Sequence, residues 1–323
     1  MDVVEYRRLG RIGALIGKGG QAKVYHAPEA RLPGVAEGLV YKEYEPGQGP
    51  GQGLRPLVRF RNSLERSAQA RLDGCTAWPL CVVEDGERVR GILMRHIPPS
   101  FMQTLKLPGT GRTVTRPREV QHLLAPAAHV RRMGMAVPDR AQRMAVCLGL
   151  AEALYLLHGH GFVYGDLNAR NEVYCLGGQP SVLLVDCDAV RKRGSAQVVA
   201  QLDAPDWDAP EPLLTPASDR YKFGLFVLRC LGTEGPQLST TRELARAGAA
   251  LDAEGQGLLR RALGADPAGR PDIADWGRYL HFRLTGRRDP ALFAAQVPQP
   301  RRDDTTSTPG WRRDGTTGKW VPQ

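Results

Sequence analysis

The feature that most constrains this fold is a long apolar helix pattern, followed by a polar loop and then by a hairpin pattern. From Pro138 onward, apolar residues recur at three- and four-residue spacing, which is the period of one helix face. Gly159 and Gly161 favour an end to that helix. After the polar loop, "EVYCL" and "SVLLV" predict two strands joined by the turn "GGQP". The loop is therefore held between a buried helix and a buried hairpin.

This loop and the hairpin carry polar side chains whose chemistry suits phosphate transfer. Asp166 and Asn171 lie in "YGDLNARN", and Asp186 follows the apolar run "SVLLV". A carboxylate directly after a buried strand is costly unless it binds something. Mg²⁺ on substrate phosphates prefers a few hard oxygen ligands, which Asn171 and Asp186 supply together. Asp166 is then free to orient an attacking hydroxyl or to accept its proton.

Two further motifs near the start of the chain suit a phosphate ligand. In "IGKGGQAKVY", Gly17, Gly19 and Gly20 stand between two strand patterns, and Val24 continues the second strand. Glycine lets backbone N–H groups approach phosphate oxygens closely, although a Gly-rich hairpin without a ligand has the same pattern. In "LVYKEY", Lys42 lies within an apolar strand. A lysine on a buried face needs an anion, whereas a lysine on an exposed edge strand does not.

The remaining patterns divide the chain into two lobes and a tail. Within the first 97 residues, strand patterns occupy 9–44 and 78–97, and one helix pattern covers 56–71. Residues 98–117 are rich in Pro, Gly and Thr, and helix patterns dominate the later part. We therefore predict an N-terminal lobe over 1–97, a C-terminal lobe over 98–290 and a disordered or weakly ordered polar tail over 291–323.

Composition narrows the classes of function. A net charge of +10 suits a polyanionic partner or a phosphate pocket, but no basic stripe interleaved with aromatic residues occurs. A dedicated nucleic-acid-binding role is therefore not favoured. The six cysteines form no CxxC pair and no Cys/His cluster with zinc-ligand spacing, which indicates a reducing compartment. No apolar run is long enough to span a bilayer, and the start "MDVVEYRRLG" lacks the apolar segment of a signal peptide. We expect a cytoplasmic protein without a membrane partner.

The order of these motifs resembles that of a bacterial eukaryotic-like protein kinase domain, from about residue 9 to about residue 285. "GKGGQAKV" is similar to the Gly-rich loop, with Ala22 in place of the third glycine, and "ILMRHI" is similar to the strand before the hinge. "YGDLNARN" is similar to the catalytic loop, and "DCD" stands where DFG usually stands. "DAPE", "SDRYKFG" and "DPAGRP" resemble three later motifs, of which the first and last imply a pair between Glu211 and Arg270.

The resemblance implies an α+β, bilobal, protein-kinase-like fold. Its N-terminal lobe would be a small antiparallel sheet with one helix, and its larger C-terminal lobe would be mainly α-helical. The implied activity is an ATP-dependent, Mg²⁺-dependent transfer of the γ-phosphate to a Ser or Thr hydroxyl of a protein. Lys42 would contact the phosphates, pair with Glu65 of the helix and lie within about 15 Å of Asp186, the reach of two side chains. The implied ATP-binding residues are Gly17, Lys18, Gly19, Gly20, Val24, Lys42, Glu65, Met94 and His96.

The catalytic loop departs from the family pattern at three positions, the first of which is Tyr164 in place of a histidine. Gly165 replaces the arginine that usually precedes the catalytic Asp166, which removes the usual receiver of a phosphorylated activation loop. Asn168 replaces a lysine, and we expect Arg170 to supply the missing positive charge near the transferred phosphate. The implied catalytic residues are Asp166, Arg170 and Lys42, and the implied Mg²⁺ ligands are Asn171 and Asp186.

Two other functions stay open. A small-molecule phosphotransferase of the aminoglycoside or choline kinase kind has the similar loop HGDxxxxN, which Gly165 matches. The later motifs "APE", "SDRYKFG" and "RP" favour the protein kinase instead. An ATP-binding pseudokinase scaffold would keep the fold without turnover. Such a scaffold would have no need to retain Lys42, Asp166, Asn171 and Asp186 together.

Overall fold

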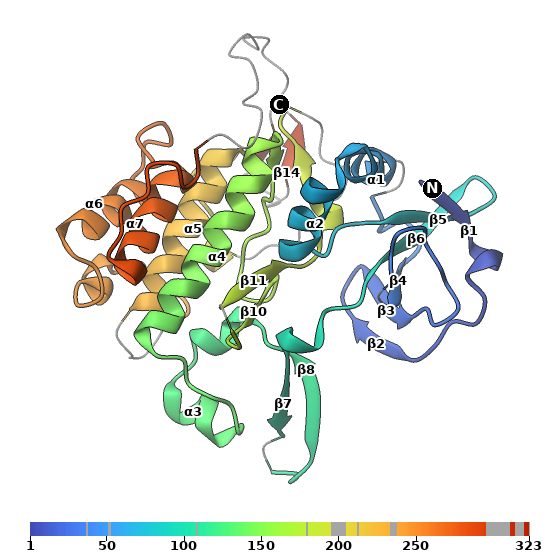
Figure 1. Ribbon diagram of the computed structural model, residues 1–323, viewed down its shortest axis with the longest axis horizontal. Coiled ribbons are helices and arrows are strands. Elements are labelled where there is room, and N and C mark those ends of the chain that lie inside the picture. The colour runs from blue at the N-terminus through green and yellow to red at the C-terminus, as the bar shows by residue number, and fades with distance from the viewer. Residues whose placement is uncertain are drawn as a thin grey trace. The chain divides into compact units, whose positions relative to one another are not determined.

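The computed structural model describes most of the chain, and Figure 1 shows its elements. The described residues are 1–36, 38–50, 53–107, 109–178, 180–194, 205–211, 213–232 and 238–294, with the backbone of 311–313 and 320–322. The chain forms two compact units. The first unit contains Met1–Pro98 and Val185–Ala189, and the second contains Pro99–Leu184 and most of the described residues after Ala189. Both helices and strands occur, so the predicted α+β class is confirmed.

The first unit is built on a six-stranded sheet in the order β1-β5-β6-β4-β3-β2. Its strands are β1 (Val3–Glu5), β2 (Leu15–Lys18), β3 (Ala22–His26), β4 (Leu39–Tyr44), β5 (Cys81–Asp85) and β6 (Arg88–Arg95). The sheet is mixed, because β1 pairs with β5 in parallel while the other neighbours are antiparallel. The predicted antiparallel sheet is therefore wrong at one edge. The difference arises because the first five residues, to which the sequence assigned no strand, pair beside β5.

Each face of this sheet has its own hydrophobic core. Alternate residues of a strand point to opposite faces, so Tyr41 belongs to one core and Tyr44 to the other. The core on the Tyr41 side also contains Leu9, Cys81 and Leu93. Helix α1 (Leu54–Ser63) supplies two side chains to the opposite core, whose buried residues are Ala22, Tyr44, Leu54, Val58, Val82 and Ile92.

Two helices stand where the sequence predicted one. The pattern over 56–71 is divided between α1 and α2 (Arg66–Cys75), because Leu64 and Glu65 have extended backbone with ψ of 150° and 155°. Arg61 of α1 donates two hydrogen bonds, of 2.7 and 2.6 Å, to the carboxylate of Asp73 in α2. In one continuous helix these residues would be about 18 Å apart along the axis. The break therefore lets a tertiary ion pair form.

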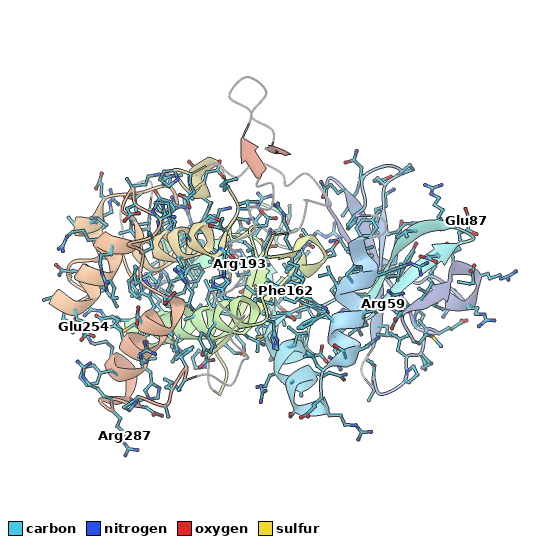
Figure 2. All side chains as sticks on the ribbon, turned by 90° about the horizontal axis from the view of Figure 1, so that it is seen from above. Arg59, Glu87, Phe162, Arg193, Glu254 and Arg287 are labelled. Carbon is cyan, nitrogen blue, oxygen red and sulfur yellow. The ribbon has the colours of Figure 1, made fainter. Side chains whose placement is uncertain are left out.

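The second unit is mainly helical, with several short two-stranded sheets. Its helices are α3 (Ala127–Arg132), α4 (Arg140–Gly159), α5 (Pro216–Leu231), α6 (Ala253–Ala262) and α7 (Ile273–Thr285). Its sheets pair β7 (Met102–Lys106) with β8 (Thr113–Pro117), β9 (Phe162–Val163) with β12 (Arg191–Lys192), and β10 (Glu172–Cys175) with β11 (Ser181–Leu184). Figure 2 shows the side chains of this unit, with Phe162 in β9 and Arg193 directly after β12.

Helix α4 is the central element of this unit and contacts α5, α7 and β11. It begins after a capping box in which Asp139 and Gln142 bond to each other's backbone. Gly149 permits the close contact with β11, because a Cβ atom there would lie 3.2 Å from the backbone nitrogen of Val182. The predicted helix and the hairpin packed on it are thus confirmed, with the register Glu172 opposite Leu184.

Most of the predicted polar tail lies outside the described residues. The exceptions are residues 291–294, where Phe293 packs on Tyr155, and two short strands. These strands, β13 (Trp311–Arg313) and β14 (Trp320–Pro322), pair antiparallel.

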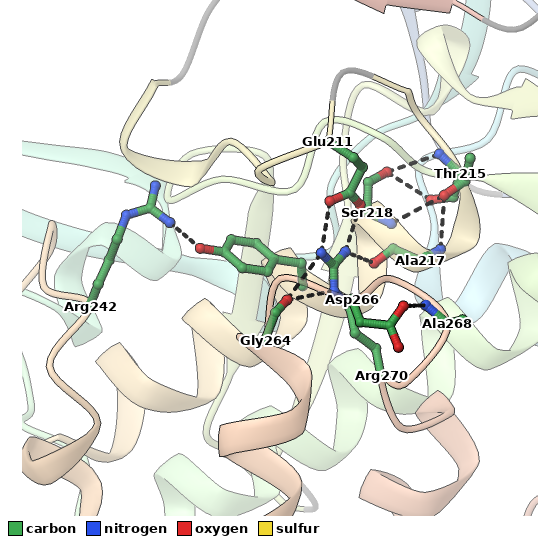
Figure 3. Close-up of polar contacts among 10 residues, drawn as sticks. Glu211, Thr215, Ala217, Ser218, Arg242, Gly264, Asp266, Ala268 and Arg270 are labelled. Carbon is green, nitrogen blue, oxygen red and sulfur yellow. Dashed lines mark hydrogen bonds and ion pairs between the residues drawn. The ribbon is translucent and has the colours of Figure 1, made fainter.

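A buried ion pair joins Glu211 to the helices of the second unit. Arg270 donates to both carboxylate oxygens of Glu211, at 2.5 and 2.7 Å, and the Arg270 side chain is 0% exposed. The same guanidinium donates to the carbonyl of Ala217 at 2.9 Å and lies 4.9 Å from the centre of the Tyr221 ring. Figure 3 shows Glu211, Ala217 and Arg270 converging in this way. The pair implied by the resemblance is therefore confirmed.

We expect Glu211→Gln to lower the free energy of unfolding by about 3 kcal/mol, because it leaves the buried Arg270 charge without its counter-charge. Arg270→Lys should cost nearly as much, since an ammonium group cannot form two parallel bonds to a carboxylate. Urea unfolding of the full chain measures both losses.

The matched control is an exposed ion pair in the same unit. Arg288 and Glu254 lie 3.0 Å apart with side chains 66% and 47% exposed, and Figure 2 shows Glu254 at the surface of α6. Glu254→Gln should therefore cost less than about 1 kcal/mol. A loss at Glu211 no larger than the loss at Glu254 would contradict the prediction.

Candidate active site

A cluster of charges in the first unit surrounds Lys42 of β4. Lys42 Nζ donates to Asp186 Oδ1 at 2.9 Å and to Asp188 Oδ1 at 2.8 Å. The hydroxyl of Tyr44 donates to the other oxygen of Asp188 at 2.5 Å. The side chain of Asp188 is 6% exposed, whereas that of Asp186 is 50% exposed. Asp188 is thus fully engaged by Lys42 and Tyr44, while Asp186 keeps carboxylate surface that a ligand can reach.

The predicted proximity of Lys42 and Asp186 is confirmed, because the two side chains touch although they lie 144 residues apart. Asp186 has a φ of 55°, in the left-handed region that Asp and Asn tolerate better than most other side chains. Its carbonyl accepts the N–H of Ala189 at 3.2 Å, which closes a tight turn after β11. A substitution at Asp186 therefore has to tolerate the left-handed backbone, in addition to its effect on the Lys42 ammonium.

Burial and charge act in opposite directions within this cluster. Burial would raise the pKa of Asp188, but the Lys42 ammonium and the Tyr44 hydroxyl hold that pKa below its ordinary value. Burial would lower the pKa of Lys42, yet the carboxylates of Asp188 and Asp186 raise it above its ordinary value. At neutral pH, Lys42 is a cation and Asp188 is an anion.

The register of the sheet places several predicted ATP-binding residues on one face. Lys42 is opposite Val24 of β3 and Ile92 of β6, and Met94 is opposite Val40. Residues that are directly opposite, or two apart in one strand, share a face. Val24, Lys42 and Met94 therefore lie on the same side of the sheet.

The Gly-rich motif forms the turn between β2 and β3. Gly17 is opposite Val24, with a register shift between Leu15 and Gly17. The N–H of Gly19 donates to the carbonyl of Ala22 at 2.9 Å. Lys18, Gly19 and Gly20 are exposed, so their backbone is accessible to a ligand.

His96 follows β6, and its imidazole stacks on that of His26. The two ring centres are 5.2 Å apart and the rings are tilted by only 8°. The N–H of His96 donates to the carbonyl of Gly38 at 3.0 Å, which fixes the backbone at this end of the sheet.

Glu65 is not the partner of Lys42. It is an exposed residue at the N-cap of α2, and the bonds of the Lys42 ammonium go to Asp186 and Asp188. Helix α1, which packs on the Lys42 face, contains no Asp or Glu between residues 54 and 63. The predicted Lys42–Glu65 pair is therefore corrected to a Lys42–Asp188 pair. Tyr44 gave a sequence signal for this arrangement, since it lies two residues after Lys42 and so shares its face.

In the second unit, Asp166 and Asn171 lie in one loop and are hydrogen-bonded to each other. The side-chain amide of Asn171 donates to the Asp166 carbonyl at 3.0 Å and to Asp166 Oδ2 at 2.6 Å. The amide of Asn168 donates to Asp166 Oδ1 at 3.2 Å. Each carboxylate oxygen thus receives one amide N–H. The acceptor that remains on the Asn171 side chain is Oδ1, the atom that can bind a cation.

A buried carboxylate anchors this loop. Asp219 of α5 is 0% exposed and accepts the N–H groups of Tyr164 and Gly165, each at 2.8 Å. His158 Nε2 lies 2.9 Å from the same carboxylate, and Lys222 Nζ donates to the carbonyl of Gly165 at 2.7 Å. Gly165 has a φ of 75°, a conformation that favours glycine. The departure at Gly165 therefore also has a conformational cause.

Arg170 is exposed at the far end of the loop. Its backbone N–H donates to Asn168 Oδ1 at 2.9 Å. Burial raises the pKa of Glu119, and the Arg170 charge opposes that rise. Among the described residues, the Arg170 guanidinium has no hydrogen-bond partner, which leaves it available to a ligand.

Sequence reasoning missed two buried charges beside the loop. Burial lowers the pKa of Arg191 in β12 to about 10, and the carboxylates of Asp219 and Asp166 oppose the decrease. Glu172 in β10 is 0% exposed. Its Oε1 accepts the N–H of Asn168 at 3.4 Å, and its Oε2 has no hydrogen-bond partner within the described residues. The run "RKR" gave no sign of which cation is buried, because all three positions look alike in sequence.

No family model matches the chain, and no curated protein matches it. All six cysteines are free thiols, and five of them are buried. Within the described part of the chain, no group of three or more His, Cys, Asp and Glu side chains forms a metal-binding cluster. Over the same residues, no helix is long and apolar enough to cross a membrane.

We expect Asp188→Asn to lower the free energy of unfolding by about 3 kcal/mol, because it removes the buried counter-charge of Lys42. Asp186→Asn should cost about 1 kcal/mol or less, because that carboxylate is half exposed and solvent screens its charge. The Asp188 effect should shrink as the pH falls below about 4. The unfolded carboxylate then binds a proton, while the native carboxylate, whose pKa is held below its ordinary value, stays ionised until a lower pH. Urea unfolding measures the Asp188→Asn loss at pH 7 and at pH 3.5, and the Asp186→Asn loss at pH 7. Equal losses at the two positions would refute this account.

The buried Glu172 carboxyl should make the stability difference between the parent chain and a Glu172→Gln variant grow with pH. Burial raises its pKa well above the ordinary value, with a further rise from Asp166, while the Asn168 N–H and Lys222 act against it. The unfolded chain therefore loses this proton at lower pH than the folded chain, and stability falls as the pH rises from about 4.5. Glu172→Gln, which stays neutral, should match the parent near pH 4 and exceed its melting temperature progressively up to pH 8. A difference that does not change over this range would disprove the assignment.

Proposed function

We propose that this protein is an ATP-dependent protein kinase that transfers the γ-phosphate of ATP to a Ser or Thr hydroxyl of a protein. The observation that carries the proposal is the contact between Lys42 and Asp186. It joins a buried strand lysine to a half-exposed carboxylate beyond a buried hairpin. These are the cation and the metal ligand that a nucleoside triphosphate requires. The Glu211–Arg270 pair supports the proposal independently.

In this proposal the first unit binds the nucleotide. Lys42 bonds to its phosphates, with Asp188 and Tyr44 keeping the ammonium in place. The turn between β2 and β3 offers backbone N–H groups to the same phosphates. The residues assigned to ATP are Gly17, Lys18, Gly19, Gly20, Val24, Lys42, Met94 and His96.

Mg²⁺ is the cofactor that fits the available oxygen donors. Asp186 presents a half-exposed carboxylate, and Asn171 has its amide nitrogen turned to Asp166 and its oxygen left as an acceptor. Both are the hard oxygen ligands that Mg²⁺ prefers. When bound, the ion would offset the negative charge of the phosphates.

Asp166 is the group assigned to the acceptor hydroxyl. The amides of Asn168 and Asn171 hold its carboxylate in one orientation, so that it can orient the hydroxyl and take its proton. Arg170 is assigned to the transferred phosphate. There it supplies the positive charge of the family lysine, whose position Asn168 occupies. Its exposed guanidinium suits that role.

The proposed setting is the cytoplasm, because six free thiols, five of them buried, fit a reducing compartment. The proposed partners are ATP and a protein substrate.

The test is incubation of the full chain with Mg²⁺ and γ-labelled ATP, with and without total cell protein. Label on the chain itself or on other proteins is the expected result. Label that appears only in small molecules would indicate a small-molecule phosphotransferase instead. Nucleotide binding without transfer to any acceptor would indicate a scaffold and would refute the proposed activity.

Substitutions at Asp166 and Asp186 should separate the two assigned roles. Asp166→Asn should lower turnover roughly 100-fold or more while nucleotide affinity stays unchanged, because the hydroxyl loses its proton acceptor. Asp186→Asn, which suits the left-handed backbone, should weaken the binding of the Mg²⁺–nucleotide complex and thereby lower turnover. Calorimetric titration with and without Mg²⁺ measures affinity, and transfer of labelled phosphate measures turnover.

Arg170→Ala is the companion variant, with lower turnover and little change in nucleotide affinity as the expected result. Arg260→Ala, at an exposed position of α6, serves as the control for loss of one surface charge. Equal loss of nucleotide affinity in the Asp166 and Asp186 variants would be incompatible with the assigned roles.

A further inference from the structure

Residues 98–137, all of which except Pro98 belong to the second unit, form a satellite with a small core of its own. Leu105 of β7 packs with Val130 of α3 and with Met135. The N–H of Lys106 donates to the carbonyl of Met133 at 2.9 Å, which joins the β7–β8 hairpin to the end of α3. Figure 1 shows the hairpin extending away from α4, α5 and α7 of its unit. We call residues 98–137 the basic arm.

The basic arm carries a large share of the net charge of the chain. It contains six Lys or Arg residues and one acidic residue, Glu119, so its net charge of +5 is half of the +10 of the whole chain. Five of the six cations are exposed, and among the described residues none of these five forms an ion pair. These five are Lys106, Arg112, Arg116, Arg131 and Arg132. Unpaired cations gathered on one satellite produce a local positive potential that attracts an anionic partner.

The arm is hydrogen-bonded to the loop that carries Asp166. The N–H of Gln121 donates to the carbonyl of Ala169 at 2.8 Å, and the N–H of Tyr174 donates to the carbonyl of Arg118 at 2.9 Å. The charges of Arg170, in the loop, and Arg116, in the arm, both act on Glu119. Positive charge therefore continues from the loop onto the arm.

The surroundings of these cations favour a polypeptide over a nucleic acid. The one Phe, Tyr or Trp of the arm is Phe101, which is 6% exposed, so no aromatic ring is offered for base stacking. The exposed neighbours on the hairpin are small and polar, such as Thr104, Thr113 and Thr115. Helix α3 has six residues, too few to lie along a groove of duplex DNA.

We propose that the basic arm binds an acidic segment of the protein whose hydroxyl receives the phosphate. This inference rests on the proposed kinase activity only in calling the bound protein a substrate. The binding of an acidic segment to the arm requires no activity. The acidic segment lies next to the acceptor hydroxyl in the substrate chain, because the arm is hydrogen-bonded to the Asp166 loop. Glutamate or aspartate side chains pair with the arm, and the pairing weakens as salt screens the exposed charges.

The test compares two fluorescein-labelled peptides that contain one serine beside either five glutamates or five glutamines. Anisotropy measured with the full chain in 50 mM salt, without nucleotide, should show about tenfold tighter binding of the glutamate peptide, as expected for a few exposed charge pairs. Arg131→Glu/Arg132→Glu should abolish that preference. Arg112→Glu/Arg116→Glu, on the hairpin, should also lose the preference. This second variant tests the arm independently if the first variant fails to fold.

The matched control is Arg260→Glu/Arg261→Glu, an exposed pair of neighbouring arginines that likewise ends a helix, α6. It makes the same change in net charge, and it should keep the preference within twofold. Equal binding of the two peptides, an equal loss in the control, or tighter binding of a single-stranded DNA of the same length would overturn the proposal. Transfer of labelled phosphate to the two peptides is measured separately. Preferential binding without transfer would refute the kinase activity and keep the surface, whereas transfer with equal KM for both peptides would refute the surface and keep the kinase.

Discussion

The candidate site depends on the ion pairing of the buried Lys42 ammonium with its neighbouring carboxylates. A cation in this position needs counter-charge, since removal of a charge from water costs several kcal/mol unless it is paired. Asp188 provides that counter-charge from within the core, and Tyr44 occupies the second oxygen of the carboxylate. Because Asp188 is held in this way, the neighbouring Asp186 is positioned at the same lysine with half of its side chain still exposed. One carboxylate fixes the lysine, and the other stays accessible.

This arrangement replaces the helix carboxylate that the family resemblance implied. That resemblance implied a counter-charge from Glu65, which lies at the N-cap of α2 instead. Here the carboxylate lies two residues after Asp186 in the same short turn. Lys42 therefore stays paired whatever helix α1 does, since α1 carries no acidic residue.

The second unit also contains a buried charge, the Asp219 carboxylate, and backbone N–H groups bond to it. The loop with Asp166 has consecutive N–H groups, at Tyr164 and Gly165, that bond to the single buried carboxylate of Asp219. The side-chain amides of Asn168 and Asn171 then hold the Asp166 carboxylate. The loop contains no helix or strand, but the N–H groups of Tyr164 and Gly165 and the Asp166 carboxylate all have partners within the unit. A loop of this kind can present a carboxylate to a substrate without rearrangement.

The sequence by itself predicted the α+β class, a helix from Pro138 that the structure has at Arg140–Gly159, and the hairpin that follows it. The family resemblance of its motifs implied the pairs Lys42–Asp186 and Glu211–Arg270. Periodicity fixes such elements locally, and ordered motifs over a long stretch fix a few distant pairs. Only the tertiary structure decided that Asp188 rather than Glu65 pairs with Lys42, that the helix pattern over 56–71 breaks at Leu64, and that β1 lies parallel to β5. The reason is physical: each of these choices depends on which buried charge or strand edge lies nearby after folding, and local residue spacing carries no information about that.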